Sequence, residues 1–207
     1  MWILALLSSY LLGSLPWGLW IGQMKGVDIR RQGSGNLGAT NVARILGYHL
    51  GLMVFLLDAA KGALAVALGR MALSGGSGDG AYLPALCGVL AILGHVTTPW
   101  AGFRGGKGVA TGAGTAALLM PWPCLIALSA FAGLFAITRI VSLASLTAAA
   151  VLPVSLILLK SGGAERPWLI GWALIVAAMV ILRHNSNIRR LLKGEESRFG
   201  RRKGGSE

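Results

Sequence analysis

The sequence predicts an all-α integral membrane protein with seven transmembrane helices, and two observations support that prediction. Of the 207 residues, 55% are apolar and only 13% are charged, whereas soluble domains carry about 25% charged residues because their surface faces water. The apolar residues also fall in long runs, with basic residues between and after them. Much of the protein surface is therefore expected to face lipid.

Seven apolar runs approach the length at which a helix crosses a bilayer. A hydrocarbon core of about 30 Å takes roughly 17–25 helical residues to cross. Several runs are shorter, so their helices are expected to begin within the adjacent loops. In chain order the runs are Met1–Ile21, Leu50–Leu68, Ala81–Val96, Val109–Met120, Leu125–Thr138, Val141–Leu159 and Trp168–Leu182.

Two boundaries need an explanation. A cleavable signal peptide begins with a basic segment, but Met1–Ile21 has no charge and its basic residues follow it, so it is predicted to remain as a span. Between the fourth and fifth runs, Pro121-Trp122-Pro123 is predicted to form a tight turn, because proline interrupts a helix.

The basic residues predict the orientation of the spans. With the N-terminus outside, fifteen Lys and Arg fall on the cytoplasmic side and three, Arg70, Lys160 and Arg166, on the other, as the positive-inside rule expects. Eight of the fifteen follow the last run. Residues 1–185 are therefore predicted to form one membrane domain, and residues 186–207 a basic cytoplasmic tail along the anionic inner leaflet.

This distribution also bears on possible partners and cofactors. A formal net charge of +12 by itself could indicate nucleic acid, but its placement around apolar runs favours a membrane role, and no nucleic-acid partner is expected. Cys87 and Cys124 lie within apolar runs and match neither a zinc spacing nor a disulfide framework, so both are predicted to be buried thiols. No metal or organic cofactor site is predicted.

Four polar clusters interrupt the apolar pattern, and all four fall on the predicted cytoplasmic side. Small residues let backbone N–H groups approach a ligand, while Arg and Lys add positive charge. The first three clusters contain no acidic residue after Asp28, so the sequence predicts a site for phosphate groups. The clusters are 33–44, 94–111, 138–145 and 183–195.

Familiar phosphate and catalytic motifs do not fit. Gly33, Gly35 and Gly38 spell G-x-G-x-x-G, but no strand or βαβ unit surrounds them. Gly106-Lys107 resembles the end of a Walker A loop, yet Gly108 stands where Ser or Thr is needed. Neither an H-E-x-x-H zinc motif nor a G-x-S-x-G elbow occurs, and no histidine begins the His-Asp motif of the common glycerolipid acyltransferases.

Taken together and in order, the four clusters resemble those of one enzyme family. They are Gly33–Asn41 with Arg44, the GGKGVAT segment Gly105–Thr111, the T-R-x-x-S-x-x-S run Thr138–Ser145, and H-N-x-N-I-x-R from His184 with Gly194-Glu195. This order is similar to that of the bacterial acyl-phosphate–glycerol-3-phosphate acyltransferases of the PlsY type. The resemblance covers essentially the whole chain and includes Asp58-x-x-Lys61-Gly62.

The resemblance implies a reaction, its partners and a location. A fatty acyl group would move from acyl phosphate to the 1-hydroxyl of sn-glycerol 3-phosphate, giving lysophosphatidic acid and inorganic phosphate. The implied partners are the two substrates, membrane lipid and, functionally, the enzyme that makes acyl phosphate. The implied location is the bacterial cytoplasmic (inner) membrane, with seven spans and a cytoplasmic active site.

The resemblance and the residue types together assign hypothetical roles to individual residues. Arg44 and Lys107 are expected to neutralise phosphate charge, and His184 and Asn187 to hold glycerol 3-phosphate. The resemblance favours a substrate phosphate oxygen as proton acceptor, with His184 as the rival base. The predicted catalytic residues are Ser34, Arg44, Lys107, Ser145, His184 and Asn187. The predicted substrate-binding residues are Gly35, Asn36, Thr40, Asn41, Arg104, Gly105, Gly106, Gly108, Arg139 and Ser142.

Simpler interpretations remain open for several residues. Ser34 could be only a helix N-cap, Ser142 and Ser145 could bond within their own helix, and Arg139 could anchor a membrane edge. Asp58 and Lys61 are i,i+3 partners that could form a structural ion pair or support the site from below.

Three other functions also remain open from the sequence. The chain could transport a phosphorylated anion, could take its acyl group from acyl-CoA or acyl carrier protein, or could bind lipid without catalysis. A polar site confined to one face of the membrane would argue against transport.

Overall fold

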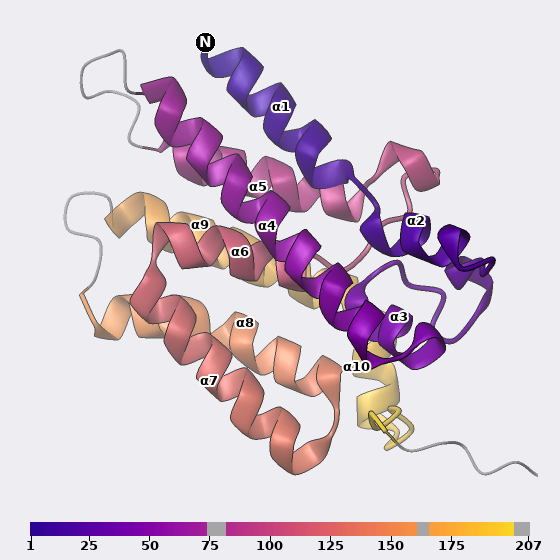
Figure 1. The fold of residues 1–207 in the computed structure, drawn as a ribbon. Helices are drawn as coiled ribbons and strands as arrows, with labels where there is room; N and C mark the ends of the chain where they lie inside the picture. Colours follow the sequence, from indigo (N-terminus) through magenta and orange to yellow (C-terminus); the bar gives the residue numbers. More distant parts are fainter. Residues whose placement is uncertain (74–81, 161–165, 201–207) are drawn as a thin grey trace, which may run out of the picture.

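The computed structural model describes residues 1–73, 82–160 and 166–200, and every regular element within these ranges is helical (Figure 1). Two 3-10 turns, Ile29–Arg31 and Pro99–Ala101, accompany the α-helices. The α-helices are α1 (Trp2–Ser14), α2 (Trp17–Met24), α3 (Ala39–Leu46), α4 (Tyr48–Leu73), α5 (Leu83–Val96), α6 (Val109–Leu119), α7 (Pro121–Thr138), α8 (Val141–Leu158), α9 (Arg166–Arg183) and α10 (Asn185–Leu192). Within these ranges the predicted all-α class is confirmed. Residues 201–207 of the predicted tail lie outside the described residues.

Each of the seven predicted runs coincides with a helix, but their lengths differ. Five segments in the described part of the chain are long and apolar enough to cross a membrane, and a sixth qualifies if α9 and α10, which are bent by 64°, count as one. Helix α6 is shorter. The five are Trp2–Met24, Tyr48–Leu73, Leu83–Ala101, Pro121–Thr138 and Val141–Leu158. Seven spans therefore remain a prediction.

Proline positions shift two of the predicted boundaries. The first run is broken, because α1 ends at Ser14 and α2 begins after Pro16. The predicted turn at Pro121–Pro123 is wrong: the break is the single residue Met120, and Pro121 is the first residue of α7. Proline suits a first helical position because its missing N–H has no intrahelical partner there.

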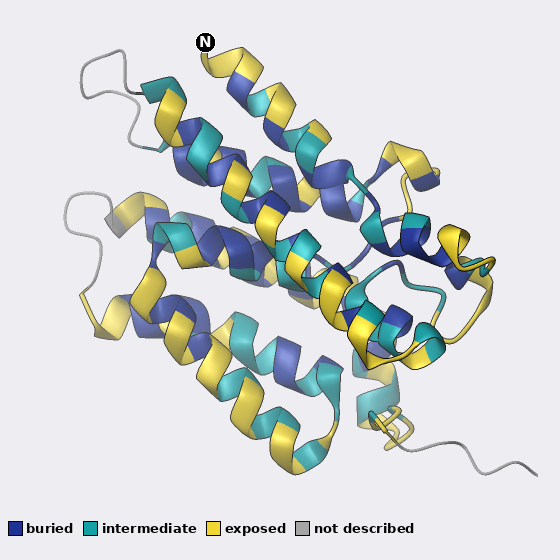
Figure 2. Ribbon diagram, viewed as in Figure 1, coloured by how far each residue is buried: buried dark blue, intermediate teal, exposed yellow. Residues whose placement is uncertain are grey.

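The long helices expose apolar residues, and Figure 2 shows many exposed positions along α1 and α7. Leu4, Leu7 and Leu11 of α1 are each more than half exposed, while α7 buries only Pro123, Cys124 and Ala127. Exposed apolar surface on this scale marks a surface that contacts lipid or another protein. Both cysteines are buried and unpaired, as predicted.

Glycines allow the helices of the bundle to approach closely. A Cβ on Gly62 of α4 would lie 2.3 Å from the Thr111 oxygen of α6, and one on Gly114 of α6 would lie 1.8 Å from the Ala59 oxygen of α4. In the same way, Gly94 of α5 packs against the Tyr10 oxygen of α1. Small residues at helix interfaces are the usual device of membrane bundles, and here they bring α4 close to α6 and α5 close to α1.

Candidate active site

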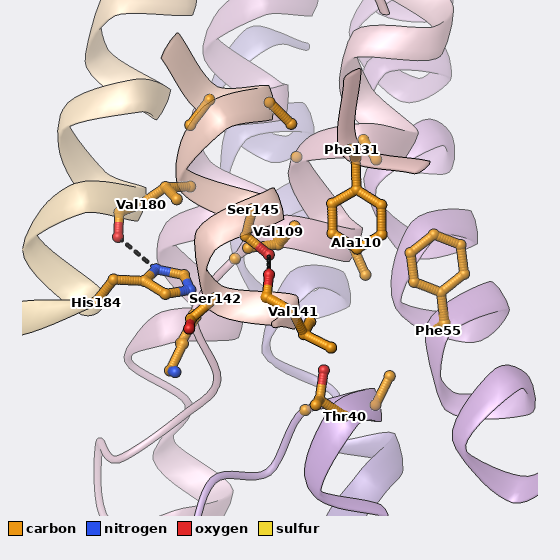
Figure 3. Close-up of a pocket in the computed structure, with 18 of the residues that line it drawn as sticks. Thr40, Phe55, Val109, Ala110, Phe131, Val141, Ser142, Ser145, Val180 and His184 are labelled. Atoms are coloured by element: carbon orange, nitrogen blue, oxygen red, sulfur yellow. Dashed lines mark hydrogen bonds between the residues drawn. The ribbon is translucent and has the colours of Figure 1, made fainter. Parts of the chain in front are cut away.

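One pocket collects residues from all four predicted polar clusters. Its polar end is lined by the first turns of three helices, through Thr40 of α3, Val109 of α6 and Ser142 of α8, and by the start of α10. Figure 3 shows Thr40, Ser142 and His184 around this end of the pocket. Since helix N-termini carry partial positive charge and unpaired N–H groups, this end is suited to anions.

The first cluster forms a loop that is held by Asn41. The buried Asn41 side chain donates to the backbone oxygens of Ile29 and Gln32 and accepts from the Ser34 N–H at 2.8 Å. Its hydrogen-bonding groups thus shape the loop, a more structural role than the predicted contact with substrate. The N-cap of α3 is Gly38, so Ser34 is not a helix cap.

Several side chains of this loop and of α3 face the pocket. Ser34, Asn36, Thr40 and Arg44 all line it. In the described part of the chain, neither the Ser34 nor the Thr40 hydroxyl has a hydrogen-bond partner within the protein, so both can bind a ligand. The predicted residue Gly35 lies beside them but does not line the pocket; it has a positive φ of 67°, which glycine adopts without strain.

The second cluster differs in part from the prediction that its glycines bind substrate. The N–H groups of Gly105 and Gly106 donate to the oxygens of Val96 and His95, at 2.9 and 3.1 Å, so they cannot also bind phosphate. Lys107 and Gly108 do line the pocket, and Gly108 caps α6 with a φ of 82° that favours glycine. The donors suited to phosphate are therefore Lys107 and the N-terminus of α6.

The two serines of the third cluster have different roles. Ser145 donates to the Val141 oxygen of its own helix, at 2.8 Å, whereas Ser142 donates to Glu196 at 2.7 Å. Both line the pocket. Two predicted binding residues, Arg104 and Arg139, are exposed and do not line it. Arg139 instead accepts the Phe199 N–H with its backbone oxygen, at 2.7 Å, which fastens the segment after α10 to the end of α7.

That segment brings in Glu196, which the sequence analysis missed. The Glu196 side chain is 4% exposed. It accepts from Ser142, from Asn187 at 2.6 Å and from Arg190 at 2.6 Å. Asn187 in turn accepts a hydrogen bond from the Lys107 ammonium. Of the two adjacent glutamates, the predicted motif took Glu195, and the sequence alone contains no signal that distinguishes them.

His184 lies at the same end of the pocket, between α9 and α10. Its Nδ1 is 2.7 Å from the Val180 oxygen, as Figure 3 shows, so Nδ1 carries the proton of the neutral ring and Nε2 is left as an acceptor. Burial and the positive charge of Lys107 lower the pKa of His184 to about 4. The ring is therefore neutral at physiological pH.

The polar end carries excess positive charge. Burial, together with Arg190, Arg44 and Arg183, lowers the pKa of Lys107 to about 8, against the opposing effect of Glu196. Burial would raise the pKa of Glu196, but hydrogen bonds from Asn187, Ser142 and Arg190 outweigh it and hold that pKa below its ordinary value. The polar end thus holds one carboxylate and four cations, and the surplus of positive charge favours an anionic ligand.

The pocket continues from this polar end into an apolar part between α4, α6, α7 and α8. Phe55 and Phe131 lie on one side of it (Figure 3), and small residues such as Ala127, Ala148 and Ala149 widen it. Asp58, for which a structural ion pair and a supporting role at the site were both open, also lines the pocket, as does His95. In the described ranges, no group of three or more His, Cys, Asp or Glu side chains is placed to hold a metal ion.

Comparison with known proteins gives concordant results. Residues 3–194 match the family model described as glycerol-3-phosphate acyltransferase. The chain is 44% identical over 193 residues to a glycerol-3-phosphate acyltransferase of Anaeromyxobacter dehalogenans (strain 2CP-C), covering 92% of this chain and 94% of that one. It is 47% identical over 205 residues to one of Synechococcus sp. (strain JA-2-3B'a(2-13)), covering 97% and 96%.

Two crystal structures share the fold. They are of PlsY (YgiH), an integral membrane glycerol 3-phosphate acyltransferase, in its glycerol 3-phosphate form and its lysophosphatidic acid form. The first aligns with a TM-score of 0.87 at 37% identity, covering 96% of both chains. The second aligns with a TM-score of 0.85 at 37% identity, covering 96% of this chain and 95% of the other.

Proposed function

This chain belongs to the glycerol-3-phosphate acyltransferase family of integral membrane proteins, and we propose that its acyl donor is acyl phosphate. The acyl group is transferred to the 1-hydroxyl of sn-glycerol 3-phosphate, and the products are lysophosphatidic acid and inorganic phosphate. The solved PlsY forms contain glycerol 3-phosphate and lysophosphatidic acid, which are the acceptor and the acylated product of this reaction.

The observation that carries the proposal is the two-part character of the pocket. Its polar end combines Arg44 and Lys107 with three helix N-termini, and its other end is apolar. Acyl phosphate has a phosphate joined directly to a hydrocarbon chain, so it matches that division. Acyl-CoA would bring a bulky nucleotide to the polar end, which must also hold glycerol 3-phosphate, so it is the less suitable donor.

The positions of the side chains suggest how the two substrates divide the polar end. Ser34, Thr40 and the N-terminus of α6 surround the acyl phosphate, next to the apolar part. Lys107, Asn187 and His184 hold glycerol 3-phosphate, since they lie together on the side of α10. Arg44 lies at the mouth of the pocket and neutralises phosphate charge there.

Acyl transfer needs little chemistry from the protein. The 1-hydroxyl oxygen attacks the acyl carbonyl carbon, the bond from that carbon to the phosphate oxygen breaks, and phosphate leaves with the electron pair. Acyl phosphate is a mixed anhydride, so the leaving group is good. The protein brings two anions together and stabilises the charge that develops.

The proton of the attacking hydroxyl passes to a phosphate oxygen of the substrate in this proposal. A phosphate monoester has a second pKa of about 6, which makes it a stronger base than His184 with its pKa of about 4. His184 Nε2 instead accepts a hydrogen bond from glycerol 3-phosphate. The test is His184→Gln, which should raise KM for glycerol 3-phosphate and retain most of kcat; a loss confined to kcat would make His184 the base.

We also infer the topology and location. Seven spans, an N-terminus outside and a site on the cytoplasmic face of the bacterial inner membrane are supported by the fifteen-to-three division of basic residues. The segment after Arg183 contributes Asn187 and Glu196 to the pocket. The first part of this segment therefore serves the site, and we assign its basic end to the membrane surface. Reporter fusions at each terminus test this arrangement, and a cytoplasmic N-terminus would overturn it.

The decisive experiment compares acyl donors. Purified protein is given glycerol 3-phosphate with acyl phosphate, acyl-CoA or acyl carrier protein, and lysophosphatidic acid is measured. Product from acyl phosphate alone is expected. Product from acyl-CoA or acyl carrier protein alone would overturn the donor assignment while leaving the family activity intact.

A further inference from the structure

Three ionisable side chains form a cluster within the helical bundle. The Lys61 ammonium lies 2.8 Å from Asp58 Oδ1, and His95 Nδ1 lies 3.5 Å from the same oxygen. None of the three side chains is more than 8% exposed. Ionisable groups at such positions are costly to keep and are usually functional. Asp58 and His95 also line the pocket.

One side of this cluster is fixed to the scaffold. Lys61 also donates to the backbone oxygen of Leu15, at 2.8 Å, where α1 breaks before Pro16. The neighbouring Ser14 oxygen accepts from the Thr98 hydroxyl at 2.6 Å. Both carbonyl groups at the end of α1 thus accept hydrogen bonds from other parts of the bundle. Because Lys61 is bonded to the fixed Leu15 oxygen, it holds the Asp58 carboxylate in place.

The other side of the cluster meets the glycine loop that precedes Lys107. The His95 backbone oxygen accepts the Gly106 N–H, and a Cβ on Gly106 would lie only 2.0 Å from His95 Nε2. Gly105 is equally close to the His95 backbone, since its Cβ would lie 1.9 Å from the His95 oxygen. The loop therefore rests directly on the imidazole ring and backbone of His95, one residue before Lys107.

We propose that His95 is a positioning residue, which is oriented by the Lys61-neutralised carboxylate of Asp58, and that it fixes the glycine loop so that Lys107 reaches the substrate phosphate. This inference rests on the proposed role of Lys107 in binding glycerol 3-phosphate. Asp58 and Lys61 balance each other's charge, so the cluster contributes no net attraction for anions. Its effect passes through the loop, and a displacement of about 1 Å at a binding group can cost a hundredfold in rate.

The primary test is His95→Ala in the purified full-length protein, with KM for glycerol 3-phosphate, kcat and the thermal midpoint measured. We expect KM to rise by about tenfold or more, with a smaller change in kcat. His95→Asn, whose amide nitrogen takes the place of Nδ1 toward Asp58, should give an intermediate KM. His95→Asn also tests the proposal if His95→Ala does not fold. In that case, a wild-type KM for His95→Asn together with a lowered thermal midpoint would overturn the proposal.

A matched control separates positioning from general loosening of the bundle. Cys87 is fully buried on the same helix and does not line the pocket, so Cys87→Ala should lower the thermal midpoint and leave KM unchanged. If His95→Ala only lowers the midpoint as Cys87→Ala does, the positioning role is wrong. A loss confined to kcat would likewise overturn it, because that result indicates proton transfer by His95.

A double-mutant cycle tests the route through Lys107. If His95 acts by placing Lys107, then His95→Ala adds little to the loss in kcat/KM already caused by Lys107→Ala. Additive losses would overturn the inference and leave the proposed function intact. A Lys107→Ala variant with wild-type KM would overturn the proposed role of Lys107 itself, so the two failures are distinguishable.

Discussion

The molecule contains two clusters that each have a carboxylate surrounded by cations, and they differ in charge balance. At the polar end of the pocket, Lys107 is close enough to the carboxylate Glu196 and to the cations Arg190, Arg44 and Arg183 to feel their charges, so positive charge is in excess. Within the bundle, Asp58 faces Lys61 and His95, and the carboxylate of Asp58 is balanced by the ammonium of Lys61. Excess positive charge can bind an anionic ligand, whereas a balanced ion pair has no net charge and serves to hold the helices together.

The two clusters also differ in where their partners come from. Asp58 and Lys61 are three residues apart on one helix, while Glu196, which follows α10, is bonded to Ser142, 54 residues away, and to Arg190 within α10. The local pair can be seen in the sequence, but the distant one forms only when the chain after α10 folds back. The following predictions test this contrast, beginning with the largest expected effect.

Breaking the balanced cluster should chiefly reduce stability. Lys61→Met leaves the buried Asp58 carboxylate without its main counter-charge, and removing one partner of a buried pair costs about 3–5 kcal/mol. Asp58→Asn/Lys61→Met removes both charges and should recover most of that loss. Thermal midpoints in detergent measure both variants. Equal stability of the single and double variants would show that the pair is not the source of the cost.

Removing one cation from the unbalanced cluster should chiefly reduce activity. Lys107→Ala should lower kcat/KM for glycerol 3-phosphate by about 10²–10³-fold, the usual cost of losing a charged group that stabilises an anionic transition state. Its thermal midpoint should stay close to wild type, because three other cations remain near Glu196. Steady-state kinetics measure the loss, and Lys193→Ala, which lies outside the pocket, serves as the control.

The lowered pKa of Lys107 predicts a pH dependence. Its ordinary value of 10.5 falls to about 8, so the ammonium is present below pH 8 and is lost as the pH rises through that value. KM for glycerol 3-phosphate should therefore rise by up to about tenfold per pH unit above 8. The charged groups that face Lys107 are Glu196, Arg190, Arg44 and Arg183, and the His184 ring lies beside them.

An arginine replacement provides the control for this pH effect. Lys107→Arg keeps a cation that does not deprotonate, so its KM should be flat across pH 8. A rise that persists in Lys107→Arg would assign the titration to another group or to the substrate.

The smallest expected effect concerns the apolar part of the pocket. Ala148→Leu fills space beside the proposed acyl chain, and each buried methylene contributes about 0.8 kcal/mol. The variant should therefore shift preference toward shorter acyl phosphates by severalfold. Ala150, on the same helix but exposed, provides the control Ala150→Leu. Competition between acyl phosphates of different length measures the shift. If both variants have the same chain-length preference, the acyl chain does not lie beside Ala148.

The sequence predicted the helices well because their signal is local. Long uncharged runs are expected to be helical in a membrane, where every backbone group needs an internal hydrogen bond, and each of the seven runs contains a helix in the structure. The errors lie at boundaries that depend on single residues. Proline at 121 begins α7 where a turn was predicted, and α2, α3 and α10 are separate short helices that the apolar pattern did not distinguish.

The candidate site was predicted by residue type but not by role. The residue types Ser, Asn, Lys and His correctly indicated which segments meet at the pocket. They could not show that Asn41 turns its amide back to its own loop, that the Gly105 and Gly106 N–H groups are already bonded, or that Arg104 and Arg139 lie away from the pocket. Each of these depends on the direction of a group in three dimensions.

The sequence by itself determined the membrane character of this protein, its helical class and the phosphate-suited segments, because these follow from composition and short-range order. Only the tertiary structure decided which charges remain unpaired. It placed Glu196 among four cations and His95 beneath the glycine loop, through contacts between residues far apart in the chain. Whether a charge attracts a ligand or supports the fold depends on its neighbours in space, and those neighbours are set by how the helices pack.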